Sequence, residues 1–130
     1  MNTTLVDSSA WIAFLRGDPP AVRRIDPLLA RGRVSTAGPI AAEVLSGAPS
    51  RKDFDLLKRV FHGLEWLSDP PALWDRLAEH RFTLARRGYQ ASLVDLMIAL
   101  SALDAGHALL TRDRDFRRIQ GVIPIEVEVF

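Results

Sequence analysis

The sequence contains no cysteine, only two lysines and no long uninterrupted hydrophobic run among its 130 residues. Without cysteine, disulfides and thiolate metal sites are excluded. The N-terminus has no basic segment followed by an apolar run and a small-residue cleavage site, so no secretory signal is expected. The most apolar stretch, residues 93–110, is interrupted by Asp95, Asp104 and His107 and is not typical of a membrane span. We therefore expect a cytoplasmic protein with no membrane association.

Several familiar catalytic signatures are also missing. The chain has neither a glycine-rich phosphate loop nor a serine-nucleophile elbow. Its three histidines, at positions 62, 80 and 107, stand in unrelated contexts without the spacing of metal ligands. The formal net charge of +1 does not by itself indicate a nucleic-acid partner. The remaining candidates for chemistry are carboxylates and arginines.

Arginine dominates the basic residues: fifteen of the seventeen are Arg. Its planar fork binds phosphate at two points, whereas lysine acts as a point charge. A high arginine share also follows from genomic base composition, so it does not decide the question alone. Length and composition, with 48% hydrophobic and 25% charged residues, are those of one globular domain, expected over residues 1–130.

Short apolar segments alternate with segments of helical spacing along the whole chain. Strands are expected at residues 4–6, 33–36, 64–67, 107–111 and 125–127. Helices are expected between them, including one that begins at residues 69–71 and a nearly all-apolar one over residues 93–105. This alternation predicts an α/β fold with a mostly parallel central sheet of four to five strands and helices on both faces. The three tryptophans, at positions 11, 66 and 74, fit apolar core positions better than a base-stacking surface.

Four acids are expected at one edge of this sheet. Asp7 and Asp113 lie just after the first and fourth strands, which end at the carboxyl edge. Glu43 and Asp95 lie near the starts of helices that begin at that same edge, because crossover helices run back to the other one. Open α/β sheets bind ligands at this place. Clustered carboxylates raise one another's pKa unless a cation is present, so the pattern predicts a divalent-metal site with a phosphate substrate.

Each acid also has a simpler explanation. Asp7 stands at a helix N-cap position, and Asp95 follows Ser92 as in a capping box. Glu43 is typical of a solvent-facing helix position, and Asp113 is a common turn residue. None of these explanations accounts for all four acids lying at the same edge.

The chain resembles the PIN-domain ribonucleases and, in size and layout, the VapC-type toxins of bacterial toxin–antitoxin pairs. The resemblance spans essentially the whole chain and rests on four segments: residues 6–11 (VDSSAW), 42–45 (AEVL), 92–99 (SLVDLMIA) and 110–116 (LTRDRDF). It implies a homodimeric endoribonuclease that requires Mg²⁺, with Mn²⁺ as a substitute. It also implies a small VapB-like antitoxin that blocks the cleft.

The resemblance assigns roles to particular residues. The acids matching Asp7, Glu43, Asp95 and Asp113 form the catalytic site, and Asp7, Asp95 and Asp113 are the implied metal ligands. Ser8 and Thr111 match supporting hydroxyls, and Asp115 is the alternative to Asp113 at the variable end of the motif. The implied reaction is hydrolysis of RNA phosphodiester bonds by an activated water.

Arginines near these motifs suggest how RNA is held. We hypothesise that Arg86, Arg112 and Arg114 flank the cleft and contact the RNA backbone, since phosphate contacts position a strand without reading its sequence. Three alternatives remain open: a metal-dependent DNA nuclease, a small-molecule phosphatase, and a PIN-like protein that only binds partners. The phosphatase alternative is disfavoured because Ser9 stands where an aspartyl-phosphate mechanism needs a second acid.

Overall fold

Five parallel strands form a single sheet in the computed structural model, which describes residues 2–130. Their order across the sheet is β3-β2-β1-β4-β5, and every neighbouring pair is parallel. The strands are β1 (Thr4–Val6), β2 (Val34–Thr36), β3 (Glu65–Trp66), β4 (Ala108–Thr111) and β5 (Val127–Val129). β1 is central, with Leu5 paired to Ser35 on one side and to Leu109 on the other.

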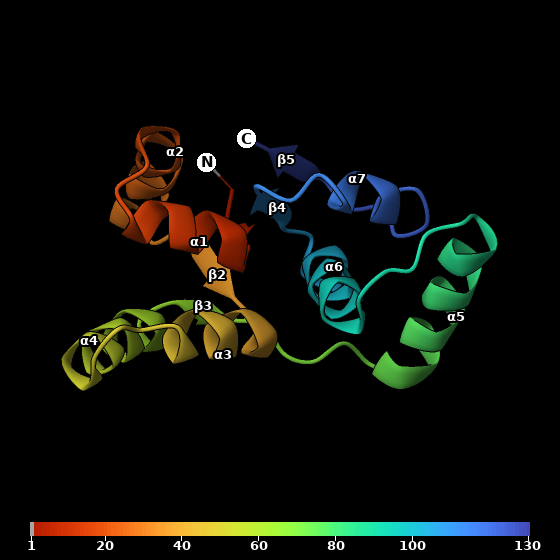
Figure 1. The fold of residues 1–130 in the computed structure, drawn as a ribbon, viewed down its shortest axis with the longest axis horizontal. Helices are drawn as coiled ribbons and strands as arrows, with labels where there is room; N and C mark the ends of the chain where they lie inside the picture. The colour runs from red at the N-terminus through yellow and green to blue at the C-terminus, as the bar shows by residue number, and fades with distance from the viewer. Residues whose placement is uncertain (1) are drawn as a thin grey trace.

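Seven helices connect the strands. They are α1 (Ser8–Leu15), α2 (Pro19–Ala30), α3 (Gly38–Ser46), α4 (Arg51–His62), α5 (Leu73–Arg86), α6 (Leu93–Ala105) and α7 (Phe116–Ile119). Right-handed crossovers place the helices that connect β1 to β2 and β2 to β3 on one face, and the later helices on the other. Figure 1 shows α1 and α2 on one side of the strands and α6 and α7 on the opposite side. The predicted α/β fold with a parallel sheet is confirmed.

The strand order creates a crevice above the middle of the sheet. From β1 the chain proceeds to β2 on one side, whereas from β4 it proceeds to β5 on the other. The connections that leave the adjacent carboxyl ends of β1 and β4 therefore diverge, and open α/β sheets bind ligands at such a point. Asp7 follows β1 directly and Asp113 lies two residues after β4.

The core is built around the central strands and α6. Leu5, Leu109 and Leu110 are fully or almost fully buried. So are six residues of α6, which lie between Leu96 and Ala102. On the other face, Trp11 of α1 packs against Phe61 of α4 with ring centroids 4.8 Å apart. The central strands and α6 are held rigidly by this packing, so the residues that follow them have fixed positions.

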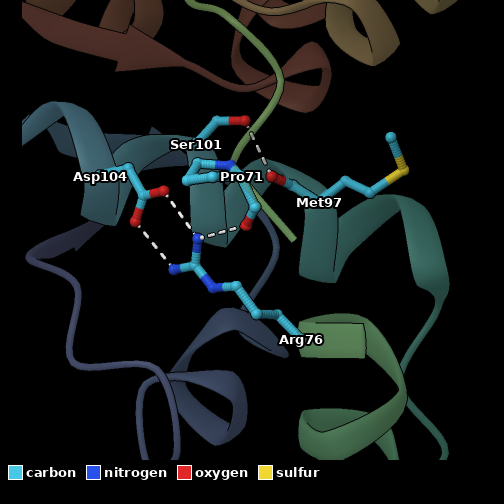
Figure 2. A network of polar contacts seen from close by, with 5 residues as sticks. All are labelled: Pro71, Arg76, Met97, Ser101 and Asp104. Atoms are coloured by element: carbon cyan, nitrogen blue, oxygen red, sulfur yellow. Dashed lines mark hydrogen bonds and ion pairs between the residues drawn. The ribbon is translucent and has the colours of Figure 1, made fainter. Parts of the chain in front are cut away.

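A bidentate ion pair joins α5 to α6 (Figure 2). The Arg76 guanidinium donates to both carboxylate oxygens of Asp104 at 2.7 and 2.8 Å, and also to the Pro71 carbonyl at 3.3 Å. The helix does not begin at residues 69–71 as the sequence predicts. It begins at Leu73, because Ala72 has a left-handed backbone (φ 52°) that interrupts the helical path.

The prediction that all three tryptophans occupy core positions is wrong for two of them. Trp66 and Trp74 are 45% and 69% exposed, whereas Trp11 is buried as expected. β3 is a two-residue strand at the sheet edge, and Trp74 lies about 100° around α5 from its buried neighbour Leu73.

The last strand starts two residues later than expected, at Val127. The Gln120 side-chain amide donates to the Ile125 carbonyl at 2.9 Å, so this carbonyl is used before regular pairing begins. In the described part of the chain, no helix combines the length and apolar character needed to cross a membrane.

Candidate active site

Asp7 is a buried carboxylate held by hydroxyl groups. Only 5% of the residue is exposed. Its Oδ2 accepts hydrogen bonds from the Ser9 and Thr111 hydroxyls, each at 2.8 Å. Its Oδ1 has only a long 3.5 Å contact with the Ser8 hydroxyl. One carboxylate oxygen is therefore fixed, and the other keeps lone pairs for a ligand.

The simpler explanation of Asp7 as a helix cap does not hold. Asp7 occupies the N-cap position of α1, but its side chain makes no capping hydrogen bond to the helix. The carboxylate is instead bonded to the end of β4 through Thr111. Its position thus serves the crevice between β1 and β4 rather than the start of α1.

The same hydroxyls orient the turn after β4. The backbone N–H of Arg112 donates to Ser9 Oγ, and that of Asp113 donates to Thr111 Oγ1, both at 3.0 Å. Each hydroxyl has one proton, which it gives to Asp7, so its oxygen accepts from the turn. Asp113 Oδ1 in turn accepts from the Asp115 N–H at 2.9 Å. Asp113 is therefore a turn residue, as the simpler explanation proposes, but its turn is tied to Asp7.

Asp95 has a raised pKa because it is partly buried and lies near the other acids. Burial, followed by the charges of Asp7 and Asp113 and a smaller one from Glu43, raises the pKa of Asp95 from 3.8 to about 6. The Ser92 hydroxyl, which caps α6 by accepting from the Asp95 N–H at 3.0 Å, opposes this rise. The capping prediction is confirmed, and it coexists with a carboxylate placed near three like charges.

In the described part of the chain, none of these four acids forms an ion pair with a basic side chain. Within residues 2–130, the ion pairs formed by Asp and Glu involve other acids, namely Asp18, Asp55, Glu65, Asp104 and Glu128. Glu43 is exposed on α3 and is the most peripheral member of the group. The group therefore carries uncompensated negative charge, which favours a cation.

The three arginines proposed to bind RNA differ in their surroundings. Arg112 pairs with Asp18 at 3.1 Å and covers the Phe130 ring at 5.0 Å, so its guanidinium points toward the turn between α1 and α2. Arg86 covers the Phe82 ring on its own helix. Arg114 is exposed. Only Arg112 and Arg114 belong to the turn that follows β4.

Comparison with known proteins supports a family assignment. The sequence model described as "PIN domain" matches residues 4–122. The chain belongs to the PIN domain family. It is 33% identical to ribonuclease VapC11 of Mycobacterium tuberculosis over 132 residues, covering 97% of this chain and 98% of that protein. It is 34% identical to ribonuclease VapC21 of the same species, covering 95% and 91%. The predicted membership in a family of ribonucleases is thereby confirmed.

Solved structures support the same fold for this PIN domain. VapBC-1 from nontypeable Haemophilus influenzae has a TM-score of 0.77 at 20% identity, covering 98% of this chain and 97% of that one. VapBC2 from Rickettsia felis, bound to a DNA fragment from its promoter, has a TM-score of 0.76 at 18% identity, covering 98% of both chains. At these identities the likeness concerns the fold alone.

PIN-domain ribonucleases use a divalent metal cation, and the oxygen donors present here suit a hard cation. As the side chains of residues 2–130 lie, no three of their acids or histidines are close enough to ligate one ion together. Mg²⁺ commonly binds through one or two carboxylates and keeps several waters. The site therefore fits a hydrated ion held by few carboxylates, and the three-ligand set of Asp7, Asp95 and Asp113 stays a prediction.

The structure also adds residues that the sequence does not single out. Ser9, rather than the predicted Ser8, makes the short hydrogen bond to Asp7. The adjacent serines could have suggested that either one supports Asp7. Tyr89 lies near Asp115, Asp95 and Asp113, whose charges, after the larger effect of burial, raise the pKa of its phenol. A single tyrosine after a glycine carries no sequence signal for this position.

Proposed function

We propose that this PIN domain is a Mg²⁺-dependent endoribonuclease and the toxin of a VapBC-type toxin–antitoxin pair, and that it acts in the cytoplasm. In this proposal the domain comprises residues 1–130. The observation that carries the proposal is a group of four acids around the carboxyl ends of β1 and β4, none of which has a basic partner within residues 2–130. Burial, and then the charges of the other three acids, raise the pKa of Asp95 to about 6. Its position at the sheet's topological switch point and the names of its relatives support the same function.

In this proposal each acid has a role. Asp7 and Asp95 hold the ion, with Asp113 as the third ligand, and Glu43 orients the attacking water from α3. When bound, the ion offsets the negative charge of the phosphate and makes water a stronger acid. Thr111 and Ser9 keep Asp7 in one orientation, so one oxygen stays directed at the crevice. Ser8 is a weaker support, and Asp115 is the alternative to Asp113.

The direct test is cleavage of single-stranded and structured RNA by the purified protein. We expect cleavage with Mg²⁺ or Mn²⁺ and none with a chelator. D7N and D95N should lose cleavage while keeping the circular dichroism spectrum of the folded protein. D26N, which changes an exposed aspartate on α2, is the matched control and should cleave normally. Normal cleavage by D7N and D95N would contradict the site.

Assays on the same purified protein distinguish the three alternative functions. A DNA nuclease would cleave an oligodeoxynucleotide of the same sequence at least as fast as the RNA. A phosphatase would release inorganic phosphate from small phosphomonoesters and leave internal RNA bonds intact. A PIN-like protein without activity would do neither.

We also propose that the VapB-like antitoxin lies along an apolar groove next to Glu43. The groove has a volume of about 500 Å³ between α1, α3 and α4, and its lining includes Ile12, Leu15 and Leu57. Ile12 and Leu15 are 36% and 47% exposed, as expected for side chains that a partner covers. From this groove a basic or aromatic side chain of the antitoxin would reach the acids. Co-purification with the antitoxin should be lost in L15E and retained in the surface control D26N.

The proposed homodimer is supported by exposed aromatic side chains on α5, at Trp74 and Phe82. Aromatic side chains are enriched in protein interfaces. Light scattering of the purified chain should give twice the mass of one chain, and W74E should shift it toward the monomer. A monomeric wild-type protein would contradict this part of the proposal.

A further inference from the structure

A pocket of about 350 Å³ lies where α5 ends and faces α7. It is lined by Leu84, Arg87, Gly88, Tyr89 and Arg118. The turn that forms it is fixed by a hydrogen bond from the Tyr89 N–H to the Leu84 carbonyl at 2.9 Å, and by Gly88 with φ 87°. Gly88 adopts a left-handed conformation that other residues rarely take, so the turn places Tyr89 directly against α7.

Two arginines from different elements meet around this tyrosine. The Arg118 guanidinium of α7 lies over the Tyr89 ring, 5.0 Å from its centroid. Arg87, at the end of α5, reaches toward the end of α7, where its Nη1 lies 3.9 Å from the position that a Cβ on Gly121 would occupy. Two guanidinium groups and one aromatic ring thus line a single hollow.

Neither arginine has an acidic partner in the described chain. Arg76 and Arg112, by contrast, pair with Asp104 and Asp18. Two neighbouring guanidiniums without a carboxylate attract an anion, and their forked geometry suits phosphate.

The pocket is close to the four-acid group. The charges of Asp115, Asp95 and Asp113 all act on Tyr89, which places the ring beside the catalytic crevice. An anion bound by Arg87 and Arg118 would therefore lie along the surface from the proposed cleavage site rather than on a distant face.

We propose that this pocket binds one nucleotide of a single-stranded RNA next to the cleaved bond, with Arg87 and Arg118 on its phosphate and its base packed against Tyr89 and Leu84. The inference rests on the proposed ribonuclease function and adds a strand-positioning site to it. Single-stranded RNA combines a regularly charged backbone with unstacked bases, and an aromatic ring flanked by arginines complements both. An acidic peptide would use the arginines but leave the ring without a role.

The test measures RNA binding separately from cleavage. D7N protein serves as a non-cleaving background, and a fluorescently labelled single-stranded RNA is titrated by anisotropy in Mg²⁺ at several salt concentrations. R87Q and R118Q are each expected to weaken binding about fivefold and to reduce the slope of log affinity against log salt by about 0.7, as for loss of one phosphate contact on a single strand. Y89A is expected to weaken binding about tenfold through lost stacking.

Matched variants control for charge and for folding. R59Q removes an exposed arginine on α4 and should change affinity by less than about twofold, because it lies outside the pocket. Y89F keeps the ring and should bind like the background protein, which guards against a folding defect in Y89A. R118K keeps the charge but loses the planar stack, and should fall between R118Q and the background.

The outcomes distinguish the two proposals. If the unsubstituted chain cleaves RNA but R87Q, R118Q and Y89A bind it as tightly as R59Q does, the pocket proposal is overturned and the ribonuclease function stands. If the three variants bind RNA as tightly as the background protein but lose binding to a labelled acidic peptide titrated in the same way, the pocket is a protein-binding site and the RNA assignment is wrong. If the chain neither binds nor cleaves RNA, both proposals fail.

Discussion

The Thr111 hydroxyl donates a 2.8 Å hydrogen bond to Asp7 Oδ2 across 104 positions of the sequence. The bond connects the ends of two adjacent strands, β1 and β4, whose pairing places Val6 opposite Leu110. Because Thr111 Oγ1 also accepts from the Asp113 N–H, one hydroxyl sets the positions of two of the four acids. We therefore expect this threonine to matter for chemistry more than for stability.

Removing the Thr111 hydroxyl should weaken metal binding and activity. T111V keeps the shape of the side chain but leaves Asp7 with one donor fewer, and loss of such a supporting group typically costs about 10- to 100-fold in metal affinity or activity. T111S should restore most of the activity. T83V, which removes a threonine hydroxyl on α5, is the control. Mn²⁺ titration and RNA cleavage measure the effect, and equal losses in T111V and T83V would contradict it.

Protonation of Asp95 should limit metal binding at low pH. Its pKa of about 6 means that the carboxylate is mostly charged at pH 7.5 and mostly neutral at pH 5. Affinity for Mn²⁺ should therefore rise through pH 6 and level off above it. Calorimetric titration in a series of buffers measures this curve, and an affinity independent of pH between 5 and 7.5 would contradict the assignment.

The raised pKa of Asp95 also predicts how the stability of the metal-free protein depends on pH. Since the folded-state pKa of Asp95 lies above its unfolded value of 3.8, the native state binds more protons between pH 4 and pH 6. The contribution of Asp95 to stability thus falls as pH rises through this window. D95N removes a partly buried charge and its repulsion by the other acids, and should be more stable than wild type at pH 8, on the order of 1 kcal/mol after allowance for solvent screening. Urea unfolding in chelator at pH 4 and pH 8 provides the measurement, and a less stable D95N at pH 8 would contradict the prediction.

Substitutions of Asp113 and Asp115 should have different effects on the pKa of Asp95. Asp113 contributes to the raised pKa of Asp95, whereas Asp115 is not among its causes. D113N should therefore lower the pKa of Asp95 and impair cleavage, and D115N should leave the pKa unchanged. Carboxyl NMR of the metal-free protein follows the titration directly. The reverse pattern would assign the fourth catalytic acid to Asp115.

The α5–α6 ion pair should contribute to stability but not to catalysis. Arg76 and Asp104 are about two-thirds buried and bonded in a bidentate manner, so R76M is expected to lower the free energy of unfolding by about 1 kcal/mol. The pKa of Asp104 is lowered by the bonded Arg76, so the contribution is present above pH 4 and is lost as pH falls further. R51M, at an exposed pair on α4, is the control and should change stability less. An unchanged unfolding midpoint for R76M would contradict the prediction.

Local patterns determined most of the elements of this protein. The Ser92 cap, the buried helix that follows it and the central strands are short-range features, in which apolar spacing and a capping hydroxyl are sufficient signals. The boundaries that failed depend on backbone conformation and side-chain contacts that apolar spacing does not reveal. Ala72 takes a left-handed conformation just before α5, and the Gln120 side chain bonds the Ile125 carbonyl just before the last strand begins.

The types and order of the acids were likewise contained in the sequence, because topology alone brings the ends of parallel strands to one edge. Only the tertiary structure decided which hydroxyl holds Asp7, how strongly the acids act on Asp95, and that Arg87, Tyr89 and Arg118 share a pocket. These relationships depend on distances of a few ångströms between side chains. Such distances are set by core packing and side-chain orientation, which no local pattern encodes.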